Sequence, residues 1–123
     1  MRRTNVLVVE DEVMICELIS EVLEENGFEV HTAATGEAAL NYLDSGTEVD
    51  VLFTDINLDG RMDGSTLAKA ARARRPDLPI VYCSGRYSSS AIAPLMPRSV
   101  FVKKPYDLGD ICTLLNRLTG TTH

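Results

Sequence analysis

Five short, mainly apolar runs constrain the fold of this chain more than any other feature of its sequence. They cover residues 5–9, 28–32, 49–54, 78–83 and 100–103, and turn-forming residues bound them. Between most of these runs, apolar residues recur every three or four positions, as they do on one face of an amphipathic helix. This alternation is typical of repeated βα units, so we expect an α/β fold whose parallel sheet is buried between helices.

The helical patterns also indicate where the helices begin and end. Pro76 closes the third helix, and we expect Ser65 to cap its N-terminus. The serine-rich and proline-bounded segment 88–97 predicts only a short fourth helix. A strongly periodic last helix is predicted over residues 108–118, and residues 119–123 are expected to form a frayed polar tail.

Length and charge restrict the class of protein. The chain has 123 residues, 45% of them hydrophobic, which predicts a single domain spanning residues 1–123. Its formal net charge of −6 disfavours direct binding to nucleic acid or to an anionic membrane. We expect Arg72, Arg74 and Arg75 to complement a helix dipole. No apolar stretch approaches the roughly 20 residues that span a bilayer, and no signal peptide is visible, so a cytoplasmic location is predicted.

The cysteines do not indicate a metal or redox site. Cys16, Cys83 and Cys112 lie far apart in the sequence, and only His31 and His123 are available to complete a zinc site. An odd number of cysteines in a cytoplasmic protein is typical of free thiols. We therefore assign the cysteines no function.

Polar residues follow four of the five predicted strands at the point where each strand ends. Glu10 and Asp11 follow the first run, Asp55 the third, Ser84 the fourth and Lys104 the fifth. In an open α/β sheet, ligands bind outside the carboxyl ends of the strands, beside the point where the strand order reverses. These five side chains are therefore expected to converge on one edge of the sheet.

The chemistry of this set suits a phosphoryl group and a divalent cation. Neighbouring carboxylates repel one another unless a proton or cation lies between them, and hard oxygen ligands suit Mg²⁺. A hydroxyl and an ammonium suit an anionic group bound beside that cation. With its oxygens held in this way, a phosphoryl group is open to in-line attack by a carboxylate such as Asp55.

The motifs around these residues resemble those of response-regulator receiver domains of two-component signalling, over residues 6–118. The resemblance implies a flavodoxin-like, doubly wound five-stranded parallel sheet in the order 2-1-3-4-5, with helices on both faces. The fourth-strand motif is similar to a variant found in some stand-alone receivers of alphaproteobacterial type, so a single-domain receiver is expected. The motifs that carry the resemblance are Val8-Val9-Glu10-Asp11-Glu12, Thr54-Asp55-Ile56-Asn57, Met62-Asp63-Gly64, Cys83-Ser84-Gly85 and Phe101-Val102-Lys103-Lys104-Pro105.

The resemblance implies a role for each residue at the metal. Asp55 would be the phosphoacceptor and a magnesium ligand, Asp11 a direct ligand, and Glu10 a ligand through water. The main-chain carbonyl of Asn57 would be a further ligand. Mn²⁺ is expected to substitute for Mg²⁺. The loop after Asp55 is one residue longer than in the commonest receivers and carries Asp59 where they often have proline, so its geometry is left open.

The same resemblance implies how the phosphoryl group is held and sensed. Ser84 and Lys104 would bind it, with a cis peptide bond before Pro105 aiming Lys104 inward. Lys103 is expected to point the other way by strand alternation. Phe101 matches the aromatic position whose rotamer follows the Ser or Thr in the family, with a plain core or edge aromatic as the alternative.

Two positions are expected to tune how long the phosphoryl group persists. The amide of Asn57 can orient an attacking water but is not a strong base, and Arg86 cannot accept a proton from that water. We therefore expect slow self-dephosphorylation, accelerated by Arg86→Gln or Arg86→Glu. The alternative is that Arg86 faces solvent or a partner, in which case neither substitution changes the rate.

The implied partners are proteins. A histidine kinase or a phosphotransfer protein would supply the phosphoryl group, and the domain would catalyse its own phosphorylation without being a conventional enzyme. The signal would leave through the face formed by the fourth helix, the fifth strand and the fifth helix, toward a protein effector.

Three other functions fit the fold class less well. A Mg²⁺-dependent phosphatase with an aspartate nucleophile needs a second acid where this chain has Asn57. An FMN binder needs a glycine- and hydroxyl-rich loop where Glu10-Asp11-Glu12 would repel a phosphate. A phosphorylation-independent pseudo-receiver is disfavoured because every reactive group is present, and binding of a phosphoryl mimic would separate these possibilities.

Overall fold

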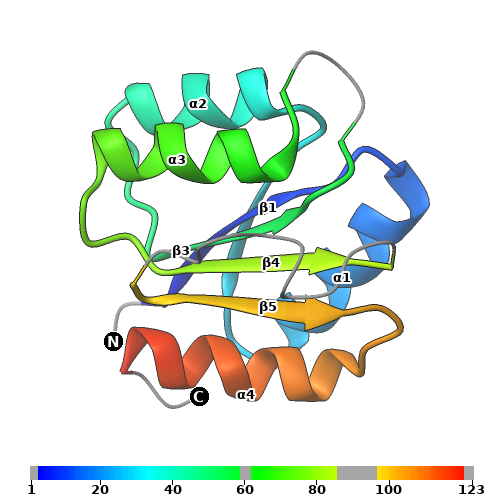
Figure 1. Cartoon of the computed structure of the whole chain (residues 1–123). Helices are drawn as coiled ribbons and strands as arrows, with labels where there is room; N and C mark the ends of the chain where they lie inside the picture. Colours follow the sequence, from blue (N-terminus) through cyan, green and yellow to red (C-terminus); the bar gives the residue numbers. More distant parts are fainter. Residues whose placement is uncertain (1–2, 59–61, 86–96, 121–123) are drawn as a thin grey trace.

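A computed structural model of the chain describes residues 3–58, 62–85 and 97–120, and it shows a five-stranded sheet between two layers of helices (Figure 1). The predicted alternation of strands and helices is confirmed. In chain order the elements are β1 (Asn5–Val9), α1 (Val13–Glu25), β2 (Glu29–Ala33), α2 (Gly36–Asp44), β3 (Val51–Asp55), α3 (Gly64–Arg74), β4 (Ile80–Ser84), β5 (Ser99–Lys103) and α4 (Leu108–Thr119).

The sheet has the predicted flavodoxin-like order, β2-β1-β3-β4-β5, and every neighbouring pair of strands is parallel. The chain moves from β1 outward to β2 and then returns to the other side of β1 to form β3, so the strand order reverses at the β1–β3 pair. All the strands therefore end at one edge of the sheet, where ligands bind in folds of this kind.

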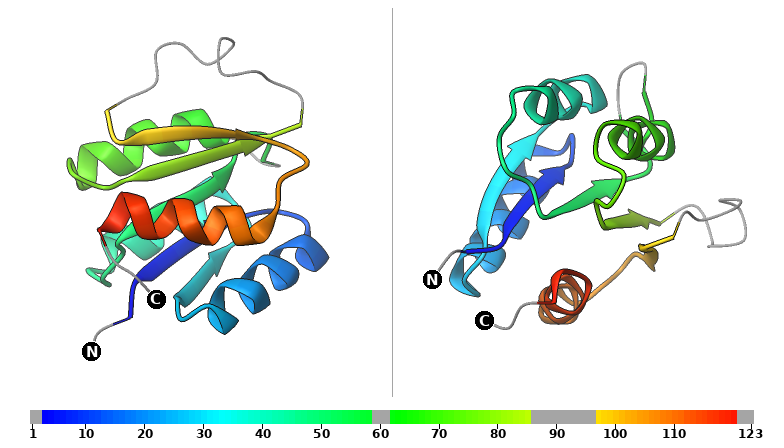
Figure 2. Two further views of the ribbon diagram at one scale, coloured as in Figure 1. Left: turned by 90° about the horizontal axis from the view of Figure 1, so that it is seen from below. Right: turned by 90° about the vertical axis from the view of Figure 1, so that its left-hand side faces the viewer.

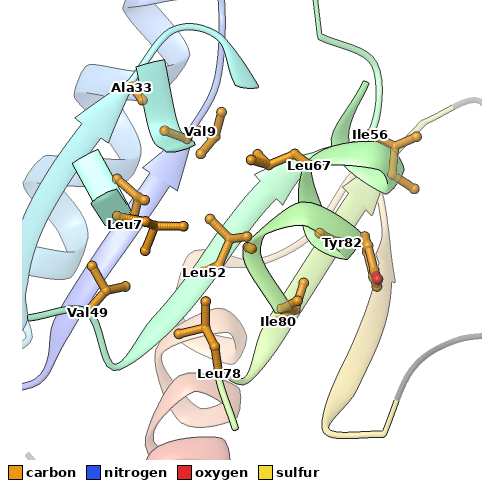
Figure 3. Close-up of a cluster of buried hydrophobic side chains, with 14 residues drawn as sticks. Leu7, Val9, Ala33, Val49, Leu52, Ile56, Leu67, Leu78, Ile80 and Tyr82 are labelled. Atoms are coloured by element: carbon orange, nitrogen blue, oxygen red, sulfur yellow. The ribbon is translucent and has the colours of Figure 1, made fainter. Parts of the chain in front are cut away.

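Among the described elements, two helices cover each face of the sheet. Helices α2 and α3 lie on one face, and α1 and α4 lie on the other, as the end-on view in Figure 2 shows. Successive side chains of a strand point to opposite faces, so Leu7 and Val9 join the core under α2 and α3, whereas Val6 and Val8 join the core under α1 and α4. Figure 3 shows the first of these cores, in which Leu7 and Leu52 lie side by side.

The ends of two helices differ from the prediction. Asp63, not Ser65, caps α3, and its carboxylate accepts a hydrogen bond of 2.8 Å from the main-chain N–H of Thr66. The last helix runs through Thr119 and ends at Gly120, whose φ of 70° is a left-handed conformation that suits glycine. The predicted short fourth helix falls largely within residues 86–96, outside the described residues.

The arginines at the end of α3 do more than complement the helix dipole, which was the only role predicted for them. Arg72 donates hydrogen bonds to the carbonyl of Leu78 at 2.6 Å and to that of Arg98 at 3.2 Å, and so connects α3 to the turn before β5. Arg75 donates to the carbonyl of Thr47 at 2.6 Å, which connects the end of α3 to the loop after α2.

Two further predictions concern the thiols and the membrane. All three cysteines are free, as predicted: Cys83 and Cys112 are buried, and Cys16 is half-buried. Among the helices that the structure describes, none has the length and apolar character needed to cross a bilayer.

Candidate functional site

The predicted site residues converge at the carboxyl edge of the sheet. Asp55 is the last residue of β3 and Ser84 the last of β4, while Glu10 and Asp11 directly follow β1 and Lys104 directly follows β5. Asp55 and Glu10 are only 7% and 4% exposed, and Ser84 is fully buried. The edge of the sheet therefore holds two buried carboxylates, a buried hydroxyl and an amine.

Both oxygens of the Asp55 carboxylate have hydrogen-bond donors. The Nζ of Lys104 lies 2.7 Å from Oδ2, and the main-chain N–H of Asn57 donates to Oδ1 at 2.9 Å. The peptide bond between Lys104 and Pro105 is cis, and Lys104 is half-buried whereas Lys103 is exposed, as predicted. These contacts fix the orientation of the Asp55 carboxylate.

Glu10 shares the ammonium of Lys104 with Asp55. Its Oε1 lies 3.6 Å from Lys104 Nζ, and its Oε2 accepts a hydrogen bond of 3.2 Å from the N–H of Glu12. Burial raises the pKa of Glu10, and the neighbouring Asp11 and Asp55 raise it further, against the opposing effects of Glu12 and Lys104. One cation is therefore shared between two buried carboxylates.

Lys104 stays protonated at this site. Burial alone would lower the pKa of Lys104, but the hydrogen bond and the charge of Asp55 outweigh burial, and the pKa is raised overall. The ammonium is thus a permanent positive charge beside the Asp55 carboxylate, as binding of an anionic group requires.

The oxygen donors at this edge fit a hydrated magnesium ion. Within residues 3–58, 62–85 and 97–120, no group of three or more His, Cys, Asp or Glu side chains is arranged to hold a metal ion. Mg²⁺, however, commonly binds proteins through one or two carboxylates and keeps several of its waters. Burial, more than the charge of Asp55, raises the pKa of Glu10, and a bound divalent cation would favour its ionised form. Carboxylates of Glu10, Asp11 and Asp55 are the donors available at this edge.

Ser84 is connected to Asn57 by a hydrogen bond that the sequence did not predict. The side-chain Nδ2 of Asn57 donates to Ser84 Oγ at 2.9 Å. The main-chain carbonyl of Ser84 accepts a hydrogen bond of 3.0 Å from the N–H of Lys104. The role of this amide in orienting an attacking water stays a prediction, and in the structure the amide contacts the hydroxyl of Ser84.

Gly64 is a second residue whose role was not predicted from the sequence. Its N–H donates to the carbonyl of Ile56 at 2.8 Å. A Cβ at this position would lie 2.1 Å from the carbonyl oxygen of Asp55 and 2.8 Å from the Cα of Ile56. Only glycine allows α3 to approach the Asp55 main chain this closely. The Met62-Asp63-Gly64 motif was the available signal for this contact.

Cys83 lies beside the site as a buried free thiol. Burial and, to a lesser extent, the charge of Asp55 raise the pKa of its thiol to about 12. Cys83 donates a weak hydrogen bond to the carbonyl of Thr54 at 3.6 Å. Burial also raises the pKa of the neighbouring Tyr106, whose ring lies 5.9 Å from that of Phe53. Both groups are therefore protonated near neutral pH.

Phe101 lies apart from the cluster of reactive groups, and Arg86 lies outside the described residues. Phe101 is half-buried in β5, pairs in register with Tyr82 and packs against the core under α2 and α3. Its response to Ser84 stays a prediction. Arg86 and Asp59 fall outside the described residues, so the effect of Arg86 on dephosphorylation also stays a prediction.

Replacing Glu10 by glutamine is expected to raise the free energy of unfolding at pH 7 in EDTA. The folded-state pKa of Glu10 is raised, so its ionised form destabilises the fold above that pKa, and this cost disappears below the ordinary value of 4.5. The advantage of Glu10→Gln should therefore shrink as the pH falls from 7 to 4. Urea unfolding followed by circular dichroism measures it, with the exposed Glu17→Gln as control. A less stable Glu10→Gln protein at pH 7 would contradict this expectation.

Comparison with known proteins places the chain among signalling domains. Residues 6–116 match the family model described as response regulator receiver domain. The sensor kinase CckA of Brucella abortus is 33% identical over 118 residues, which make up 93% of this chain and 12% of that protein. The nitrogen assimilation regulatory protein NtrX of Azorhizobium caulinodans is 28% identical over 120 residues, 95% of this chain and 26% of that protein. The chain thus spans only a small part of these relatives.

Solved structures with the same fold include single receiver domains. A response regulator receiver protein from Sinorhizobium medicae superposes with a TM-score of 0.88 at 28% identity, covering 97% of this chain and 96% of that chain. The receiver domain of NtrX from Brucella abortus superposes with a TM-score of 0.81 at 31% identity, covering 95% of this chain and 99% of that chain. These structures match the described sheet and helices over nearly their whole length.

Proposed function

Because the chain belongs to the response regulator receiver domain family, we propose that it accepts a phosphoryl group on Asp55 and changes its protein contacts in response. The observation that carries this proposal is the buried Asp55 carboxylate, which lies 2.7 Å from the ammonium of Lys104 at the carboxyl edge of the sheet. The family belongs to two-component signalling, so the proposed phosphodonor is a phosphohistidine on a histidine kinase or a phosphotransfer protein.

In the proposed reaction, an oxygen of the Asp55 carboxylate attacks the phosphorus of the donor in line. A new oxygen–phosphorus bond forms, and the bond from phosphorus to the donor's imidazole nitrogen breaks. The imidazole leaves with that electron pair and takes up a proton from solvent. A small acyl phosphate reacts in the same way, with a carboxylate as leaving group.

Lys104 and Ser84 stabilise the charge that is transferred. The ammonium of Lys104, already beside Asp55, provides a positive charge for a phosphoryl oxygen, and the hydroxyl of Ser84 provides a hydrogen-bond donor. A Mg²⁺ ion held by Glu10, Asp11, Asp55 and the main-chain carbonyl of Asn57 would neutralise the remaining phosphoryl charge, and Mn²⁺ would serve in its place.

The phosphodonor protein is proposed to contact the N-terminal part of α1. Val13, Met14 and Leu18 are 66%, 83% and 54% exposed, an unusual set for large apolar side chains. Leu18 also lines a hollow of about 420 Å³ together with Pro105, Tyr106 and Leu108, and Lys104 forms part of its wall. A donor histidine must reach Asp55 from outside, and this hollow adjoins the Lys104 side of the site.

The output is proposed to leave through the face formed by the predicted fourth helix, β5 and α4, by way of Ser84 and Phe101. Phe101 pairs with Tyr82 in the strand that ends in Ser84, so a shift at Ser84 acts on the neighbour of Phe101.

The amide of Asn57, which is bound to Ser84, cannot supply the second acid that a phosphatase with an aspartate nucleophile needs. We therefore propose a signalling domain and not a phosphatase.

Incubation with acetyl phosphate and Mg²⁺ tests the proposed function. We expect the intact mass to rise by one phosphoryl group, the modified peptide to contain Asp55, and EDTA to prevent the modification. The matched sample without acetyl phosphate controls for other adducts. An unmodified protein that is folded by circular dichroism, or a phosphoryl group mapped to another residue, would refute the proposal.

A further inference from the structure

Four hydrogen bonds connect four residues at the site into a closed ring. Asn57 N–H donates to Asp55 Oδ1 at 2.9 Å, and Asn57 Nδ2 donates to Ser84 Oγ at 2.9 Å. Lys104 N–H donates to the carbonyl of Ser84 at 3.0 Å, and Lys104 Nζ donates to Asp55 Oδ2 at 2.7 Å. The ring joins β3, the loop after it, β4 and the end of β5.

Asn57 is the residue that connects the carboxylate to the hydroxyl within this ring. Its main chain binds one oxygen of Asp55, and its side chain binds Ser84, whose side chain is fully buried. We propose that Asn57 is a positioning residue that holds the Ser84 hydroxyl at the phosphorylation site before a phosphoryl group is present. This inference rests on the proposed function of Asp55.

The hydrogen-bonding capacity of the two groups supports this role. A serine hydroxyl has two acceptor lone pairs and one O–H donor, and the bond from Asn57 occupies a lone pair and not the hydroxyl hydrogen. The bond is therefore compatible with donation by Ser84 to a phosphoryl oxygen. Holding the hydroxyl in place beforehand reduces the ordering cost when the phosphoryl group arrives.

A consequence is that Asn57 acts on the phosphoryl group through Ser84. Removal of the Asn57 amide should weaken phosphoryl binding where the Ser84 hydroxyl is present and should have little effect where it is absent. An amide that only oriented a water molecule, or that only stabilised the loop, would act equally in both backgrounds. A double-mutant cycle distinguishes these cases.

The cycle compares the wild type with Asn57→Ala, Ser84→Ala and the double variant. Its first readout is the dissociation constant of beryllofluoride, a phosphoryl mimic, with saturating Mg²⁺, measured by titration calorimetry. Asn57→Ala is expected to weaken binding by about 3- to 10-fold in the wild type, the range of one hydrogen bond, and by less than about 2-fold in Ser84→Ala. Ser84→Thr keeps the hydroxyl, so Asn57→Ala should weaken binding in that background as it does in the wild type.

The second readout is the free energy of unfolding of the same four proteins without Mg²⁺ or beryllofluoride. We expect the effects of Asn57→Ala and Ser84→Ala on the free energy of unfolding to be non-additive as well, because the hydrogen bond between Asn57 and Ser84 exists in the ligand-free protein. Asn41→Ala, which changes an exposed asparagine on α2, serves as the control and should be coupled to Ser84→Ala in neither readout.

The outcomes separate the inference from the proposed function. Additive effects on beryllofluoride binding, or coupling in stability without coupling in binding, would overturn the positioning role while leaving Asp55 as phosphoacceptor. A folded wild type that binds no beryllofluoride would overturn both.

Discussion

Replacing Asp55 by asparagine is expected to reduce phosphorylation by acetyl phosphate to background. The amide oxygen of Asn is not a nucleophile comparable to a carboxylate, so the attacking group is lost. The substitution is otherwise conservative, because an amide oxygen still accepts the bond that Asn57 N–H makes to Oδ1 at 2.9 Å. Lys104 retains Glu10, 3.6 Å away, as a partner. We therefore expect a folded protein without phosphorylation, measured by intact mass and circular dichroism.

Asp63→Asn is the matched control for this prediction. Asp63 lies at the start of α3, is exposed and caps the helix through Thr66 N–H. Asparagine is as good an N-cap as aspartate, so the variant should keep both its stability and its phosphorylation. Phosphorylation of Asp55→Asn to the wild-type level, or its loss in Asp63→Asn, would show that the nucleophile has been misassigned.

Replacing Gly64 by alanine is expected to lower the free energy of unfolding by about 2–3 kcal/mol, the upper part of the usual range for overpacking. The new Cβ would lie 2.1 Å from the carbonyl oxygen of Asp55, and main-chain atoms cannot move aside as a flexible side chain can. The start of α3 or the end of β3 must shift. Since Asp55 is the residue displaced, phosphorylation should also slow, on the order of 100-fold for a misplacement of about 1 Å.

Gly85→Ala tests whether this effect belongs to Gly64. Gly85 also lies beside the site, but among the described residues a Cβ there would meet only Lys104 Cβ, at an ordinary contact distance of 3.7 Å. We expect Gly85→Ala to fold with nearly the wild-type stability in urea unfolding. Equal losses in the two variants, or a Gly64→Ala protein as stable as the wild type, would contradict the close approach of α3 to Asp55.

The strands were predictable because a parallel sheet covered on both faces produces uninterrupted apolar runs. The residues at which the strands begin and end were harder to predict. Val49 is buried and apolar and was assigned to the third strand, yet pairing of β3 with β1 begins at Val51, opposite Val6. Apolarity reports burial, whereas a strand boundary depends on which main-chain groups find a partner on the neighbouring strand.

The α3 cap shows how tertiary contact decides between equivalent local signals. Asp63 and Ser65 are both good N-cap residues, so local propensity does not distinguish them. The helix begins at Gly64 because that residue donates to Ile56 and packs against Asp55. The contacts of Arg72 with Leu78 and Arg98 escaped prediction for the same reason, since they join segments that are brought together by the fold.

The site was predictable as a set of residues and not as a network of bonds. Parallel topology places the ends of β1, β3, β4 and β5 at one edge, so the convergence of Asp55, Ser84 and Lys104 follows from their positions in the sequence. The bond between Asn57 and Ser84 depends on the path of the loop after β3 and on a side-chain rotamer, and no residue pattern encodes either.

The position of β5 at the outside of the sheet makes the site sensitive to partial unfolding. Lys104 directly follows β5, which among the described strands pairs only with β4, whereas Asp55 ends the central strand β3. Edge elements open at a lower free energy than central ones, without global denaturation. Each such opening would take the ammonium away from the Asp55 carboxylate, so the proposed phosphorylation is expected to depend on the fraction of molecules in which β5 is closed.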